Sequence, residues 1–425
     1  MTVTKRSIGF WTAVALVMGN MIGSGVFLLP ASLAPFGGLA FGGWVISAGG
    51  GVALALVFAR LAHENPAAGG IYAYSRAAFG DLAGFLVGWG YWTAVWVGCA
   101  ALGIAFVGYL DPFFPNISRT PALAAGVAIG AVWLLTVVNL RSIGGAGKIQ
   151  VVTTALKILP LVVIGIAGLA VFAPANFAVP AQLPGGFGVI GALMSAATLT
   201  MWALMGLETA TIPADSVVQP ERTIPRATVT GTALAATIYI ISTAGVMSLL
   251  GPDALAHSTA PFADAARRFF GETGVFIVAA GGVISCFGAL NGWILIQGQL
   301  PAPVAADGLF PKVFGRVGSR GTPVFALVLG SVLSSLLIAA NSSRGLVSLF
   351  TLLIQLSTLS TLVPYVFCSL AGFMQGRRSV AGVIAFLFSM FAIAGAGTEV
   401  VYYGFLLLLG GLPIYVWVKR ARVAA

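Results

Sequence analysis

Charged side chains are scarce in this chain of 425 residues, where Asp, Glu, Lys and Arg together make up 8%. A soluble domain needs a polar surface, and about a quarter of its residues are ordinarily charged. Here hydrophobic residues make up 59% and the mean hydropathy is +1.02. The composition therefore excludes a soluble globular protein and indicates a polytopic membrane protein of the all-α class.

Cysteine and histidine are almost absent, with three and two copies respectively. Cys99, Cys286 and Cys368 all lie in apolar segments, without the paired spacing of a disulfide framework or a metal site. The sequence also lacks a nucleotide-binding loop and a catalytic triad. We therefore expect no metal, no cofactor and no enzymatic activity.

Runs of basic residues are missing too, although the net charge is +10. Lys and Arg occur singly in short connections, so a nucleic-acid partner is not expected. Apolar runs of roughly 17–25 residues predict membrane helices instead. About twelve can be placed, approximately at 8–33, 38–61, 80–110, 121–140, 149–173, 187–213, 226–250, 274–300, 323–341, 346–373, 380–396 and 399–418.

The distribution of Lys and Arg among the connections predicts the orientation. With both termini in the cytoplasm, sixteen of the 21 basic residues lie inside, four lie outside and Lys157 lies within a helix. This bias agrees with the positive-inside rule. Because the connections are short and rich in proline, we expect residues 1–425 to form one transmembrane domain without a soluble module.

The first apolar segment contains a stretch that does not suit a helix, Gly19-Asn20-Met21-Ile22-Gly23-Ser24-Gly25. A break in a helix at this depth frees backbone groups, and each unsatisfied group in hydrocarbon costs several kcal/mol. Such breaks persist where protein, water or ligand satisfies those groups, as in transporters with discontinuous helices. Alternatively, Gly23 and Gly25 let a neighbouring helix approach closely.

A second interruption is expected at Met201–Glu208 in the sixth segment, five helices after the first. That offset predicts an inverted repeat of helices 1–5 (about 8–173) and 6–10 (about 187–373). The two broken helices would then face each other at the midplane. Helices 11 and 12, at about 380–418, lie outside the repeat.

Two ionisable side chains, Lys157 and Glu208, fall at membrane depth and are therefore functional candidates. The alternatives are a lysine that reaches the membrane interface and a carboxylate that caps freed backbone donors. Trp202 and Trp293 lie on segments six and eight rather than at helix ends, where interfacial tryptophans concentrate. Each could equally be a packing residue.

Several motifs together resemble those of the amino acid/polyamine/organocation permeases, in particular the bacterial basic amino acid and polyamine antiporters. They are Gly23-Ser24-Gly25-Val26-Phe27-Leu28-Leu29-Pro30, Gly69-Gly70-Ile71-Tyr72-Ala73-Tyr74, Met201-Trp202 through Gly206-Leu207-Glu208, Gln219-Pro220-Glu221-Arg222, Gly292-Trp293 and Ala306-Asp307-Gly308-Leu309-Phe310-Pro311. The resemblance covers nearly the whole chain. It implies a LeuT-like fold, a bacterial inner-membrane location and a homodimer among lipids.

The resemblance also implies residue roles. Ser24 and Gly25 would take a substrate carboxylate, Trp202 would stack over the substrate, and Glu208 would be its acidic neighbour. The expected substrate site comprises Met21, Ile22, Gly23, Ser24, Gly25, Cys99, Trp202, Met205, Glu208, Trp293 and Ser357. The expected gate comprises Tyr91, Trp202, Glu208, Trp293 and Tyr365.

Two residues depart from the antiporters of this family. Cys99 stands where the arginine/agmatine antiporter has an asparagine, and Lys157 resembles the lysine of proton-coupled bacterial amino acid permeases. Lys157 is expected to couple protonation to alternating access by bonding carbonyls near Met21 and Ile22. We predict an exchanger of a basic amino acid and its decarboxylated amine, with a proton-coupled or exchanging permease for neutral amino acids as the alternative. The continuous polar pore lining of a channel is not visible.

Overall fold

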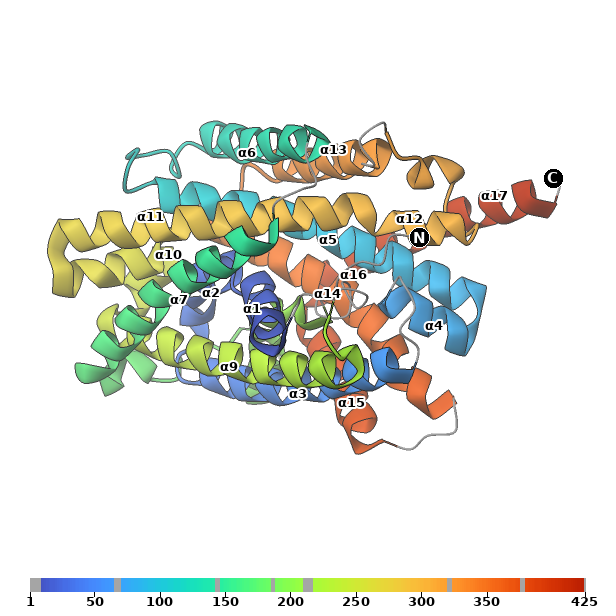
Figure 1. Ribbon diagram of the computed structural model, residues 1–425. Coiled ribbons are helices and arrows are strands. Elements are labelled where there is room, and N and C mark those ends of the chain that lie inside the picture. Colours follow the sequence, from blue (N-terminus) through green and yellow to red (C-terminus); the bar gives the residue numbers. More distant parts are fainter. Residues whose placement is uncertain are drawn as a thin grey trace.

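The computed structural model describes residues 9–64, 70–141, 146–184, 188–208, 217–318, 323–374 and 379–423, and within these ranges the chain is a bundle of helices (Figure 1). The α-helices are α1 (Phe10–Met21), α2 (Ser24–Leu33), α3 (Leu39–Glu64), α4 (Ile71–Phe79), α5 (Asp81–Leu110), α6 (Pro121–Arg141), α7 (Ala146–Ala170), α8 (Gly188–Leu204), α9 (Pro220–Leu249), α10 (Pro252–His257), α11 (Pro261–Gln299), α12 (Pro301–Ala306), α13 (Val324–Ala340), α14 (Leu346–Met374), α15 (Val380–Gly395), α16 (Thr398–Leu409) and α17 (Leu412–Val423). Short 3₁₀ turns are η1 (Ala34–Phe36), η2 (Pro174–Phe177) and η5 (Lys312–Gly315).

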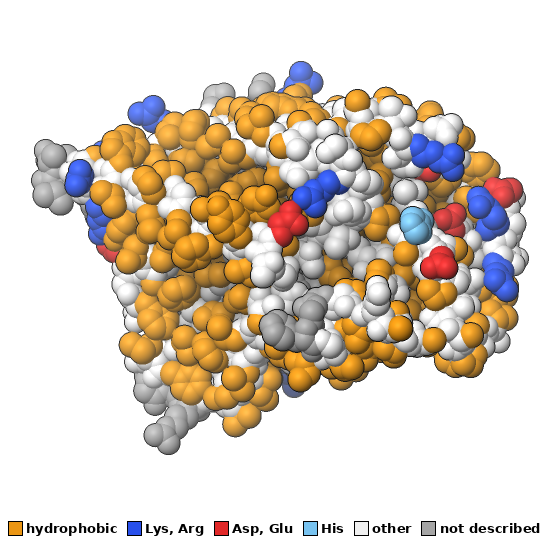
Figure 2. All heavy atoms as spheres, turned by 180° about the vertical axis from the view of Figure 1, so that it is seen from behind, with side chains coloured by type: hydrophobic (Ala, Val, Ile, Leu, Met, Phe, Trp, Pro, Cys, Tyr) orange, Lys and Arg blue, Asp and Glu red, His pale blue; other side chains and the backbone are white. Residues whose placement is uncertain are grey.

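The apolar helices account for the expected membrane segments. In the described ranges, seven helices are long and apolar enough to span a membrane, α1 and α2 form one bent pair, and four further apolar helices are shorter. These make up the twelve segments expected. On the face shown in Figure 2, hydrophobic side chains cover most of the surface and charged ones gather mainly toward one end. Such a surface suits a helical bundle in a bilayer, where only the ends meet water.

Two segment boundaries differ from expectation. The eighth helix begins at Pro261 rather than near 274, because α11 continues through a kink at Gly271 (φ 59°, ψ −157°). The last expected helix is divided into α16 and α17 at Gly410 and Gly411. Helix α8 of the sixth segment ends at Leu204, inside the interruption predicted at Met201–Glu208, and residues 209–216, where the expected segment continues, lie outside the described part.

The first membrane helix is broken where the sequence predicted it. Helix α1 ends at Met21, α2 begins at Ser24, and the two axes are bent by 45°. Gly23, between them, has φ −129° and ψ −140°, outside the helical region. The second break follows α8, where Gly206 adopts φ 98°, a conformation that favours glycine.

Helix pairings follow the symmetry of the two breaks. Helix α8 packs along α3, and α1 packs along α9. The half-helix before each break thus packs on the helix that follows the other broken helix. Helix α5 contacts α14, and α11 contacts α7. Counted as membrane segments, α5 and α14 are the third and tenth, and α11 and α7 are the eighth and fifth. If segments 1–5 correspond to segments 6–10, the contact between the third and tenth matches the contact between the eighth and fifth. This is the arrangement expected for an inverted repeat.

Candidate functional site

The centre of the bundle is where the first break meets the end of α8. A Cβ atom built on Gly25 would lie 2.9 Å from Trp202 Cδ1 and 3.1 Å from the Cα atom of Ala203. Real Cβ atoms do not approach other atoms this closely, so only glycine fits at position 25 with Trp202 where it is. Gly25 therefore does permit a close approach by another helix, which was the alternative considered from the sequence. The residue that approaches it is Trp202, one of the predicted gate residues.

Trp202 is enclosed by small residues on both sides. Its far edge faces α5, where a Cβ on Gly98 would lie 3.0 Å from Trp202 Cη2 and 3.3 Å from Ser357 Oγ. Trp293 of α11 stacks beside it, with ring centroids 6.4 Å apart and an interplanar angle of 24°. Both indoles are buried. The structure thus brings together Gly25, Trp202, Trp293 and Ser357, four of the residues expected in the substrate site.

Glu208 lies beyond the second break, between two tyrosines. Tyr365 of α14 donates a hydrogen bond to Glu208 Oε2 at 2.7 Å, and Tyr91 of α5 donates to Oε1. Among the described residues, Glu208 and Lys157 are the only buried side chains of formal charge. Bonds to a charged acceptor are roughly twice as strong as neutral ones. Three of the five residues expected to gate the site, Tyr91, Glu208 and Tyr365, therefore form one cluster that joins α5, α14 and the second break.

The other expected substrate residues are buried around this centre. Met21, Ile22 and Cys99 are buried, and Met205 Sδ accepts a contact from Thr358 Oγ1 at 3.8 Å. Ser357 Oγ donates to the carbonyl oxygen of Ala94 at 2.7 Å. The side chain of Ser24 lies outside the described part of the chain.

Lys157 lies on the opposite side of the break, against α11. It is 2% exposed, and a Cβ on Gly288 would lie 3.8 Å from Lys157 Nζ. A Cβ on Gly23 would lie 3.0 Å from Ala289 Cβ, so the break and Lys157 contact adjoining residues of α11. In the described ranges no hydrogen bond joins Lys157 to the carbonyls at Met21 or Ile22 in this conformation. Its coupling role stays a prediction.

One residue at the centre was not singled out from the sequence. Asn20 lies between the two breaks, since a Cβ on Gly206 would be 3.5 Å from Asn20 Cβ and a Cβ on Gly292 would be 3.9 Å from Asn20 Oδ1. The sequence signal that could have identified Asn20 is a side-chain amide within an apolar segment, next to a glycine-rich break. Its partners belong to two distant segments and could not be identified locally.

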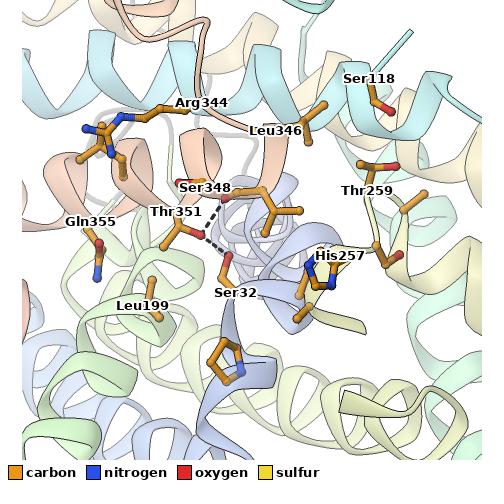
Figure 3. Close-up of a pocket in the computed structure, with 18 of the residues that line it drawn as sticks. Ser32, Ser118, Leu199, His257, Thr259, Arg344, Leu346, Ser348, Thr351 and Gln355 are labelled. Atoms are coloured by element: carbon orange, nitrogen blue, oxygen red, sulfur yellow. Dashed lines mark hydrogen bonds between the residues drawn. The ribbon is translucent and has the colours of Figure 1, made fainter. Parts of the chain in front are cut away.

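A large cavity opens at one end of the bundle. It has a volume of about 1320 Å³ and is lined by the outer ends of α2, α8 and α14 and by the connections 111–119, 256–260 and 395–398. Figure 3 shows two of its lining residues, Ser32 and Thr351, pointing toward each other, with their hydroxyl oxygens 2.7 Å apart. We call this cavity the vestibule.

The vestibule ends just above the predicted site. Its lining reaches Leu199 on α8 and Gln355 on α14, three and two residues before Trp202 and Ser357. Of the expected substrate residues whose side chains the structure describes, none lines it. Trp202 and Gly25 therefore lie beyond the deepest lining residues of the vestibule, and the predicted site does not open into it in this conformation.

A broken helix that meets the end of α8 at the centre of an apolar bundle, with a stacked indole pair beside the first break and a vestibule at one end, defines a membrane transporter of the broken-helix class. The chain belongs to the amino acid permease family, whose family model matches residues 8–416. Transporters, not enzymes, make up the relatives described below.

Three relatives show which members of the family this chain is similar to. A candidate arginine/ornithine antiporter of Bacillus subtilis (strain 168) is 34% identical, over 97% of both chains. The cadaverine/lysine antiporter of Escherichia coli (strain K12) is 36% identical over 85% of this chain and 82% of its own. The putrescine transporter PotE of the same strain is 32% identical over 97% of this chain and 96% of its own.

Proposed function

We propose that this protein exchanges a basic amino acid for its decarboxylated amine by alternating access. The relatives named for arginine/ornithine, cadaverine/lysine and putrescine support this substrate class. The observation that carries the proposal is the packing of Trp202 directly on Gly25 at the first break, three residues along α8 from Leu199, which lines the vestibule. A substrate that reaches the break must displace this indole.

The start of α2 is the proposed carboxylate site. The first N–H groups of a helix lack partners inside it, and its positive dipole end favours an anion. An amino acid would place its carboxylate there and its cationic group under Trp202, since indole faces attract desolvated cations by about 2 kcal/mol. Glu208 adds a buried carboxylate two residues after Gly206 at the second break. A decarboxylated amine keeps the cationic contacts and loses the contact to α2.

The orientation and assembly belong to the same proposal. Both termini are proposed to lie in the cytoplasm of a bacterial inner-membrane protein, so the vestibule faces outward, and two chains form a homodimer in the lipid bilayer. The repeats at about 8–173 and 187–373 would supply the two broken helices.

Counterflow in proteoliposomes tests the proposal. Vesicles loaded with arginine, lysine or ornithine are diluted into labelled agmatine, cadaverine or putrescine, and the reverse, with neutral amino acids as a parallel panel. Uptake that requires a basic counter-substrate is expected, together with its loss in Trp202→Leu and its retention in Gly126→Ala, a glycine with no atom within 4 Å of the added methyl. Exchange limited to neutral amino acids would refute the basic-substrate assignment.

The alternative of neutral amino acid transport rests on Cys99 and Lys157. Cys99 is fully buried and follows Gly98, which contacts Trp202. A thiol there offers only a weak hydrogen bond to a distal guanidinium or ammonium group. Uptake of neutral amino acids driven by a proton gradient, without any counter-substrate, would favour this alternative.

A further inference from the structure

Two motifs that lie far apart in the sequence meet at the end of the bundle opposite the vestibule. Tyr72, in the stretch Gly70–Tyr74, donates a hydrogen bond to Asp307 Oδ2 at 2.8 Å. Arg76, one turn further along α4, places Nη1 2.7 Å from the same oxygen. Asp307 directly follows α12, so both contacts join α4 to the connection after α11. Figure 1 shows α4, α12 and α17 toward the same end.

The contacts continue to the C-terminal helix. Arg76 Nε lies 2.9 Å from Asp81 Oδ1 at the start of α5, and Asp81 Oδ2 lies 2.6 Å from Lys419 Nζ of α17. We call the five residues Tyr72, Arg76, Asp81, Asp307 and Lys419 the inner cluster. It joins α4, α5, the residue after α12, and α17, so most of its bonds run between elements that could separate.

Each ion pair in the inner cluster is weak by itself. The side chains of Arg76, Asp81 and Lys419 are about one-third exposed, and exposed pairs are screened by solvent. The Tyr72 hydroxyl is better protected. Burial, and then the hydrogen bond to Asp307, raise the pKa of Tyr72 well above its usual value, so it stays a donor at physiological pH.

The inner cluster coexists with an open vestibule at the other end. Alternating access requires that one end be closed while the other is open, because two open ends would make a channel. Behind the cluster lies Cys368 of α14, fully buried and 3.5 Å from Ser75 Oγ of α4. Helix α4 therefore covers this part of α14 while it is held by Asp307.

We propose that the inner cluster is a latch that keeps the end opposite the vestibule closed and must open in every transport cycle. This inference rests on the proposed transport function, but it does not depend on which substrate is carried. Tyr72 and Asp307 are its central pair, and Lys419 recruits α17, outside the repeated helices, to the same closed state. Weak, exposed bonds suit this role, since a latch that opens in each turnover cannot be strongly stabilised.

Labelling of the native Cys368 tests the latch. The purified protein in liposomes is treated with N-ethylmaleimide, and the modified peptide is quantified by mass spectrometry, which separates Cys368 from the other two buried cysteines. Asp307→Asn should raise the Cys368 labelling rate about three- to tenfold, the range for one charged hydrogen bond discounted for exposure. Tyr72→Phe should act in the same direction, and the double variant should add little to Asp307→Asn.

A matched control is the Arg60–Glu64 pair, at 3.1 Å within α3. Arg60→Gln removes an ion pair between two residues of one helix, so it should change Cys368 labelling much less than Asp307→Asn does. A second reporter, Ser348→Cys in the vestibule lining, should be labelled more slowly in the Asp307→Asn background as the vestibule closes.

Three results overturn or support the latch. A reciprocal change at Cys368 and Ser348→Cys supports it. Unchanged Cys368 labelling in both Asp307→Asn and Tyr72→Phe overturns it. Faster Cys368 labelling without slower vestibule labelling also overturns it, because α4 would then loosen locally without alternation. Failure of the counterflow assay with reciprocal labelling intact would refute the substrate proposal alone.

Discussion

Replacing Gly25 by alanine tests whether the break serves binding or only packing. The added methyl group would lie 2.9 Å from Trp202 Cδ1, 3.1 Å from Trp202 Nε1 and 3.1 Å from Ala203 Cα. Ordinary contacts begin near 3.4 Å, and Ala203 is backbone, so the indole must move by about half an ångström. Overpacking of this kind costs typically about 1–3 kcal/mol. We expect substrate affinity to fall roughly five- to 150-fold.

A second substitution separates the two explanations. In Gly25→Ala with Trp202→Phe, the smaller ring leaves space for the methyl group. If Gly25 is needed only because Trp202 packs on it, the double variant should bind no more weakly than Trp202→Phe alone. If the methyl group also blocks the carboxylate at the start of α2, binding of the amino acid stays weak while the decarboxylated amine is affected less.

The measurement is equilibrium binding of labelled substrate to purified protein, by scintillation proximity or calorimetry. Gly126→Ala is the matched control, because it adds the same methyl group to a membrane helix with no atom within 4 Å. Normal affinity for the amino acid in Gly25→Ala would refute the reasoning and move the site elsewhere.

Three further predictions concern the residues around this centre. Tyr365→Phe removes one of the two tyrosine hydroxyls that donate to the buried Glu208 carboxylate, and it should slow exchange about five- to 150-fold. Adding Tyr91→Phe should slow exchange further. Counterflow rates equal to wild type in both variants would show that the Glu208 cluster serves packing only. Lys157→Ala should still bind substrate but lose net transport or its pH dependence, and unchanged pH-dependent uptake would return Lys157 to a structural role. Cys99→Asn should improve competition by arginine relative to shorter side chains, because an amide both donates and accepts hydrogen bonds; no gain for arginine in a competition series would contradict this.

Much of the architecture follows from local sequence. Apolar runs determine the membrane segments, because hydrocarbon excludes side chains and backbone groups that lack partners. The glycines at 23 and 25 predicted the first break, which the structure has between Met21 and Ser24. The burial of Lys157 and Glu208 was also predictable, since both lie deep inside apolar segments.

The tertiary structure alone decided which of these residues meet. Gly25 and Trp202 lie 177 positions apart. Nothing in either segment alone specifies that the Trp202 indole occupies the space where a side chain at position 25 would lie. The same holds for Tyr365 and Glu208 and for Tyr72 and Asp307, whose bonds span 157 and 235 positions. Composition and spacing fix what one segment can do in a membrane. Contacts between segments depend on how all the helices pack together, so the vestibule, the packing of Trp202 on Gly25 and the ion pairs at the opposite end emerged only from the fold.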